Sequence, residues 1–202
     1  MKFSPLFVAA ALLSMRDVPN DHPPGPPNDY IDGGAVHAAQ TEPQASPVDL
    51  GDIAPDFSYQ AADGRWQHLH DLLAQGPTLL VFGPTDVVLR AIERDRERLY
   101  DMGVVPVAVL DVRNGAARTT VEQLGLRYVV LADSRGVIAA QFNAVDGRTG
   151  REIPSLFVLD RKRRVRALMR TSLPARGYVS LAANALGIPE PGTPAATSSS
   201  PR

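Results

Sequence analysis

At residues 77–84 the chain reads Pro-Thr-Leu-Leu-Val-Phe-Gly-Pro, and this stretch indicates the fold. A short apolar run bounded by Gly and Pro on both sides is typical of a strand that is covered on both faces. Apolar residues then recur at helical spacing from Val88 to Met102, while the charged run 93–98 lies on the solvent side. Gly103 closes this helix. Together these segments predict one strand–helix unit of an α/β domain.

The rest of the domain continues this alternation. The further segments, in chain order, are a strand, a short helix, a short strand, an apolar run that fits either a strand or a helix, two strands and a last helix, at residues 104–110, 118–124, 128–131, 137–142, 155–159, 165–169 and 175–186. The last two strands enclose a short basic turn and should form a hairpin. This order predicts a mixed central sheet with helices on both faces, within one domain at residues 50–188.

The segments on either side of this domain differ from it in composition. Residues 1–15 contain an apolar run with the length of a signal-peptide core, too short for a transmembrane helix, so no transmembrane span is expected. An ordinary hydrophobic N-terminus explains this run as well, and both an exported and a cytoplasmic location stay open. Residues 16–49 are a Pro-rich linker and residues 189–202 a polar tail. Both are expected to be disordered, because they cannot bury enough apolar surface.

Composition excludes several kinds of chemistry. The chain contains no cysteine, which rules out thiol nucleophiles, disulfides, iron–sulfur clusters and cysteine-ligated zinc. Its 21 Lys and Arg nearly balance its 22 Asp and Glu, for a net charge of -1, so nucleic acid is not an expected partner. The glycine-rich phosphate-binding motifs and the Gly-x-Ser-x-Gly elbow are absent from the sequence, and no cofactor is predicted.

Several segments of the domain resemble, in order, those of one family. They read Leu-Gly-Asp-Ile-Ala-Pro-Asp-Phe at 50–57, Asp-Gly-Arg-Trp-Gln-His-Leu-His-Asp-Leu at 63–72, Leu-Leu-Val-Phe-Gly-Pro at 79–84, Ala-Asp-Ser-Arg-Gly-Val-Ile-Ala at 132–139 and Ile-Pro-Ser-Leu-Phe-Val-Leu-Asp at 153–160. This series resembles the thioredoxin-fold redoxins of the alkyl hydroperoxide reductase and thiol-specific antioxidant family, which includes the peroxiredoxins. The resemblance covers about residues 50–187 and implies a thioredoxin-like fold.

The positions that carry cysteine in this family carry no sulfur here. The two-cysteine motif of thioredoxin-like members falls on Val87 and Arg90, and the single cysteine of peroxiredoxin-like members falls on Ala91. Peroxiredoxin chemistry needs a thiolate activated by a helix N-terminus and a neighbouring cation, because the thiolate is the attacking species. The resemblance therefore implies a degenerate member, a pseudoenzyme without catalytic residues for the thiol reaction.

Four further residues frame the same position. Pro84 precedes the expected helix, and Thr85 or Asp86 is expected to cap its first turn with a side-chain oxygen. With Arg90 one turn further on, the alternative to simple capping is an anion site at this helix end. The resemblance implies that Pro154 follows a cis peptide bond beside this helix and that the adjoining backbone can pair with an extended peptide. An extended peptide or protein partner near Pro154 is therefore expected.

Two other clusters offer different chemistry. His68 and His70 alternate on an expected strand, with Asp63 and Asp71 nearby, and could bind a metal ion. A third ligand is not identifiable, however, and a solvated strand face explains these residues as well. The basic stretch from Arg161 to Arg170 could bind anions or a membrane surface, or could be a solvated turn.

The function predicted from these observations is that of a redoxin-family domain that has lost its redox cysteines and serves as a non-catalytic binding or accessory protein. One alternative is an antioxidant oxidoreductase of the same family that works without cysteine, for example through a metal ion at His68 and His70. A second alternative is a binder of anions or membrane surfaces through the stretch from Arg161 to Arg170. Whether the chain is an enzyme stays open at this point.

Overall fold

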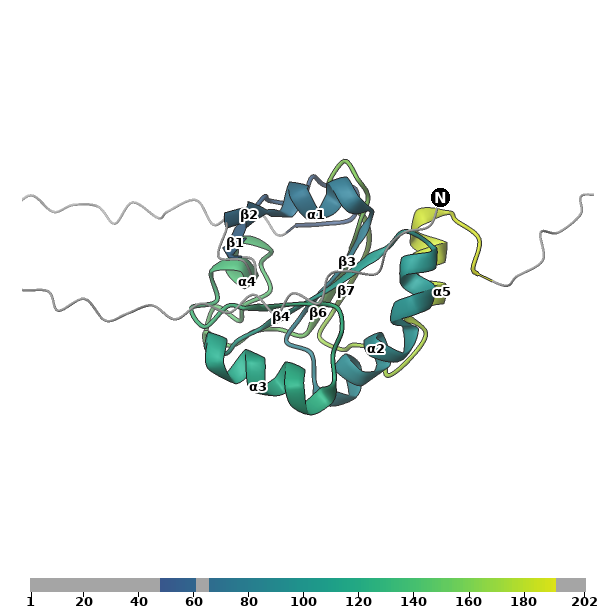
Figure 1. Cartoon of the computed structure of the whole chain (residues 1–202). Coiled ribbons are helices and arrows are strands. Elements are labelled where there is room, and N and C mark those ends of the chain that lie inside the picture. The colour runs from purple at the N-terminus through teal and green to yellow at the C-terminus, as the bar shows by residue number, and fades with distance from the viewer. Residues whose placement is uncertain (1–47, 61–65, 192–202) are drawn as a thin grey trace, which may run out of the picture.

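The computed structural model describes residues 48–60 and 66–191 (Figure 1). The predicted signal segment, nearly all of the predicted linker, most of the predicted tail and Asp63 lie outside the described residues. Val48 is already buried in the core, so the packed part of the chain begins before residue 50. Within the described ranges, no helix is long and apolar enough to cross a membrane.

Strands and helices alternate along the described part of the chain. Their order and bounds are β1 (Ser58–Gln60), β2 (Trp66–His68), α1 (Leu69–Gln75), β3 (Thr78–Phe82), α2 (Asp86–Asp101), β4 (Val105–Leu110), α3 (Asn114–Leu124), β5 (Val129–Ala132), α4 (Val137–Gln141), β6 (Ser155–Leu159), β7 (Val165–Arg170) and α5 (Tyr178–Leu186). The predicted strand–helix unit at its centre is confirmed as β3 and α2.

The central sheet has five strands in the order β5-β4-β3-β6-β7. β3 lies in the middle, where Leu80 is opposite Val107 of the parallel strand β4 and opposite Phe157 of the antiparallel strand β6. β4 and β5 are also parallel, whereas β6 and β7 form the predicted antiparallel hairpin. The mixed sheet predicted from the sequence is therefore confirmed, and β1 and β2 form a separate antiparallel pair beside it.

Each face of this sheet carries its own apolar core, and Figure 1 shows helices on both sides of the sheet. Successive side chains of a strand point to opposite faces, so Leu80 and Phe82 of β3 enter one core while Leu79 and Val81 enter the other. The first core is covered by α1, α4 and β1, and the second by α2, α3 and α5. Burial on both sides explains why residues 78–82 form an almost uninterrupted apolar run.

The ambiguous apolar run at 137–142 forms the short helix α4. Asp133 decides its conformation, because its two carboxylate oxygens accept hydrogen bonds from the backbone N–H groups of Val137 and Ala139, at 2.8 and 2.9 Å. These are N–H groups that a helix start leaves without backbone partners. A buried acidic residue thus turns a run of strand-like composition into a helix.

Two helices begin at residues other than those predicted. α3 begins at Asn114 rather than at 118, since Asn and Gly at its start rank low in intrinsic helix propensity and hide the boundary. α5 begins at Tyr178 rather than at 175. Its first backbone N–H donates to Asp95 Oδ2 of α2 at 3.1 Å, a capping contact that comes from a distant part of the chain.

Candidate functional site

The loop between β3 and α2 is the place where the family resemblance puts an active site. Gly83 follows β3 with a φ of 56°, a left-handed conformation that glycine adopts without steric conflict. α2 begins at Asp86, and Thr85 is its N-cap residue. The prediction that Thr85 caps this helix with its side chain is wrong, because its hydroxyl makes no capping hydrogen bond. Both Thr85 and Asp86 are exposed, so water can satisfy the free N–H groups of this turn.

The three positions that could carry a thiol hold Val87, Arg90 and Ala91. Val87 and Arg90 are exposed, and Val87 is 60% exposed, whereas Ala91 is fully buried in the core beneath α2. Because α2 begins at Asp86, position 91 lies in the second turn of the helix, beyond its first free N–H groups. A thiol at position 91 would therefore meet neither solvent nor the helix end that activates a thiolate.

Pro154 lies beside this loop, as the resemblance implied, since a Cβ atom on Gly83 would stand 3.6 Å from the Cα of Pro154. The expected cis peptide bond is wrong, because the described residues contain only trans peptide bonds. The trans form of an X–Pro bond is favoured by about 0.5–1 kcal/mol. In this form Ile153 has partners for both backbone groups: its N–H donates to Ala144 O and its carbonyl accepts from Ser155 Oγ, each at 2.8 Å. The chain itself thus occupies the backbone groups expected to pair with a peptide.

Glu152, which is not among the residues expected from the sequence, lies against the same loop. Both of its carboxylate oxygens are shielded from solvent, and within the described part of the chain neither has a hydrogen-bond partner. Glu152 Oε2 would lie 3.5 Å from a Cβ atom if residue 83 carried a side chain. The Gly83 N–H is close enough to favour the ionised carboxylate slightly, but its geometry falls short of a hydrogen bond.

Burial raises the pKa of Glu152 to about 7, and the negative charges of Asp111 and Asp133 add to the increase. Asp111 directly follows β4 and Asp133 directly follows β5, so these acidic groups gather at the carboxyl ends of the parallel strands. A carboxyl group that titrates near neutral pH can both give and accept a proton in this range. The only signal in the sequence is an acidic residue two positions before Pro154, and its burial depends on the packing of the loop.

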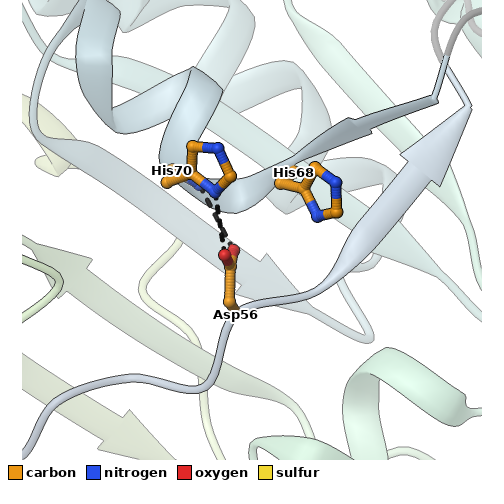
Figure 2. Close-up of side chains that lie close together, drawn as sticks. All are labelled: Asp56, His68 and His70. Atoms are coloured by element: carbon orange, nitrogen blue, oxygen red, sulfur yellow. Dashed lines mark hydrogen bonds and ion pairs between the residues drawn. The ribbon is translucent and has the colours of Figure 1, made fainter.

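His68 and His70 meet Asp56 on the surface next to α1 (Figure 2). The prediction that the two histidines alternate on one strand is wrong: His68 ends β2 and is the N-cap residue of α1, and His70 lies in the first turn of α1. This bend stacks the two rings, with centroids 5.0 Å apart and planes inclined by 14°. One potential ligand atom from each of the three residues lies within 4.8 Å of the others. Asp56 is thus the third candidate ligand, which the sequence did not identify.

Hydrogen bonds connect two members of this cluster, His70 and Asp56. His70 Nδ1 lies 2.9 Å from Asp56 Oδ2, and the His70 backbone N–H donates to Asp56 Oδ1 at 3.3 Å. Burial acts to raise the pKa of Asp56, but these hydrogen bonds outweigh it, and the pKa lies below its usual value. The hydrogen bond to Asp56 in turn raises the pKa of His70, supported by the negative charge of Asp71. The expected neighbour Asp71 is therefore part of the cluster.

Residues 50–168, more than half of the chain, match the AhpC/TSA family. The chain belongs to the AhpC/TSA family. The matched segment includes β3, α2 and all three positions that lack cysteine, so this AhpC/TSA member has lost the thiol within the part that defines the family. No curated protein is similar enough to the chain to count as a match.

Solved structures of AhpC/TSA-type proteins share the fold. Peroxidoxin BcpB from Mycobacterium tuberculosis is 22% identical, with a TM-score of 0.60 over 68% of this chain and 96% of its own. A mutant of PrxQ from Xylella fastidiosa is 13% identical, with a TM-score of 0.61 over 70% and 97%. AhpC from Enterococcus faecalis is 16% identical, with a TM-score of 0.57 over 70% and 92%. These likenesses show that the fold is the predicted thioredoxin-like one.

The basic stretch of this AhpC/TSA domain is partly engaged within the chain. Arg164 Nη1 donates to Gly51 O at 3.0 Å, and Arg170 donates to three backbone carbonyls, of which Asn143 O is nearest at 2.8 Å. These contacts connect the β6–β7 hairpin to other segments of the domain. Arg161, Lys162 and Arg166 are exposed, and they make no such contact with the described residues.

Proposed function

We propose that this AhpC/TSA-family protein does not reduce peroxides through a thiol and acts as a binding or accessory protein. The observation that carries the proposal is Ala91, a fully buried residue in the second turn of α2, at the position where the family resemblance puts the peroxidatic cysteine. No cysteine elsewhere in the sequence can take over the role of nucleophile. The domain forms a five-stranded mixed sheet, while the thiol required for the family reaction is absent from the sequence.

The face around the β3–α2 loop is where we place the contact with a partner. Val87 exposes an apolar side chain in the first turn of α2, and the half-buried Pro154 lies beside Gly83 at the start of the same loop. An extended peptide or protein partner near Pro154 stays a prediction. Because the backbone groups of Ile153 are already paired, such a partner would contact side chains here rather than extend the sheet.

The first test is peroxide consumption by the full chain. Hydrogen peroxide and an organic hydroperoxide are supplied with a thiol reductant, and a cysteine-dependent peroxiredoxin serves as positive control. We expect no consumption above that of the heat-denatured chain. Catalytic consumption would overturn the proposal and favour the alternative of an oxidoreductase that works without cysteine.

The second test addresses binding, by cross-linking in a cell extract with the full chain as bait. Val87→Ser changes the proposed face, and Val137→Ser is its matched control, since Val137 is also exposed in the first turn of a helix. A partner retained by the native chain and by Val137→Ser but lost with Val87→Ser supports the proposal. A partner retained equally by all three proteins argues against this face. Retention that disappears at high salt would favour the anion-binding alternative at the stretch from Arg161 to Arg170.

A further inference from the structure

We propose that Asp56, His68 and His70 bind a divalent transition-metal ion, with Zn²⁺ as the representative ion. Two imidazoles and one carboxylate form a mixed nitrogen and oxygen donor set, which suits zinc, copper and nickel, whereas calcium and magnesium prefer oxygen ligands alone. Three protein ligands are also the number found in open zinc sites, where water completes the tetrahedron. This proposal goes beyond the binding function above and does not depend on it.

Backbone contacts bring the three ligands together. Ser58 pairs with His68 across β1 and β2, and the Leu69 N–H donates to Phe57 O at 2.9 Å. These two links join the segment that follows Asp56 to the β2–α1 junction that carries both histidines. The cluster therefore forms as part of the fold, and an ion would not have to bring distant segments together.

Each imidazole already has a partner for the nitrogen that would not bind the ion. His70 Nε2 lies 3.5 Å from Asp71 Oδ1, and His68 Nδ1 lies 3.1 Å from Ser58 Oγ. Histidines that bind a metal almost always use their second ring nitrogen in such a contact, which sets the tautomer and the orientation of the ring. We therefore assign His70 Nδ1, His68 Nε2 and a carboxylate oxygen of Asp56 as the ligand atoms.

Binding requires a small closure of the cluster. With metal–ligand bonds of about 2.0–2.2 Å, the ligand atoms of a tetrahedral site lie about 3.3 Å apart. Here one ring nitrogen of each histidine and one carboxylate oxygen of Asp56 lie within 4.8 Å of one another. All three side chains are exposed, so rotation about their side-chain bonds can provide this closure. The ion would replace the present contact of 2.9 Å between Asp56 and His70. Arg163 Nη1, 3.9 Å from Asp56 Oδ2, is the charge that opposes binding.

The test uses the full chain, freed of metal by a chelator, and Zn²⁺ alone as the probe in competition with a chromogenic zinc indicator. We expect one ion per chain. His68→Gln and His70→Gln, made separately, should each weaken binding by about tenfold or more. The matched control is the double variant His22→Gln/His37→Gln, which removes the other two of the four histidines and should bind as the native chain does.

Cobalt provides a second readout, because the visible absorption bands of Co²⁺ in a tetrahedral site are much more intense than those of hydrated Co²⁺. These bands should appear with the native chain and be lost with Asp56→Asn, while far-UV circular dichroism shows that each variant is folded. Absence of binding by the native chain overturns the proposal. Equal affinity of the native chain and both single histidine variants, or loss of binding in the double control variant, overturns it as well. Because the readout is binding of the ion, a negative result leaves the question of peroxide reduction untouched.

Discussion

Replacing Glu152 with Gln should change how the stability of the protein depends on pH. Glu152 places both carboxylate oxygens away from solvent beside Gly83, without a hydrogen-bond partner in the described part of the chain. Burial, together with the charges of Asp111 and Asp133, raises its pKa from the usual 4.5 to about 7. Glutamine has nearly the same shape as glutamate, and its side chain stays uncharged at every pH at which the protein is folded. The substitution therefore removes the titration while largely keeping the packing.

The sign and size of the effect follow from this raised pKa. Between pH 4.5 and about 7 the unfolded chain has lost the proton of Glu152 while the folded chain keeps it, so the free energy of unfolding falls as pH rises. This contribution to stability is fully present below pH 4.5, the pKa of Glu152 in the unfolded chain, and is lost above about pH 7, its pKa in the folded chain. At about 1.4 kcal/mol for each pKa unit, the difference corresponds to about 3 kcal/mol without screening. Because Glu152 is only partly buried, we expect solvent to reduce this to ~2 kcal/mol.

The assay is urea unfolding followed by far-UV circular dichroism, at pH values from about 5 to about 8. The stability of Glu152→Gln relative to the native chain should rise by ~2 kcal/mol across this range. Taking the difference between variant and native chain removes the contributions of Asp56 and His70, which both proteins share. Glu122→Gln, at an exposed position of α3, is the matched control and should show a constant difference. A constant difference for Glu152→Gln as well would refute the reasoning.

Three further predictions concern other parts of the domain. A thiol introduced by Val87→Cys should react rapidly with a thiol reagent, because Val87 is 60% exposed. A thiol introduced by Ala91→Cys should react only after unfolding in urea, because Ala91 is 0% exposed, and equal reaction rates of the two folded variants would contradict this burial. Asp133→Ala removes two hydrogen bonds at the start of α4 and should lower the free energy of unfolding by about 1–3 kcal/mol. Urea unfolding measures this loss, and a loss below about 0.5 kcal/mol would be evidence against the capping role of Asp133. Arg163→Asn should tighten Zn²⁺ binding by about two- to fivefold in the indicator assay, because it removes a positive charge near Asp56. Asparagine is chosen because it tolerates the φ of 62° at this position, and an unchanged affinity would show that Arg163 does not oppose the ion.

Much of the fold could be predicted from local patterns. β3 was predicted with its observed bounds, because complete burial leaves an uninterrupted apolar run, and the β6–β7 hairpin was predicted from two such runs around a short turn. The helical conformation of α4 and the start of α5 could not be predicted in the same way. The conformation of α4 was ambiguous because its apolar composition fits a strand as well as a helix, although its capping residue Asp133 lies only four positions before Val137. The start of α5 depends on Asp95 of α2, whose hydrogen bond to Tyr178 joins segments that are distant in sequence.

The candidate sites show the same division. His68 and His70 were recognised from their spacing, but Asp56 comes from a preceding segment and joins them only through the pairing of β1 with β2 and the bend at the start of α1. The bond before Pro154 is trans, and the resemblance alone led to the wrong isomer.

The sequence by itself determined that this chain supplies no thiol, because it contains no cysteine and no fold can provide one. It also determined the layered α/β architecture, because apolar periodicity is a local property of the chain. Only the tertiary structure decided that Ala91 is closed off from solvent, and that Asp56 completes the cluster with His68 and His70. The same holds for the carboxylate oxygens of Glu152, which are shielded from solvent without a hydrogen-bond partner among the described residues. Burial and side-chain contacts depend on segments that are distant in sequence, and their positions follow only from the packing of the whole domain.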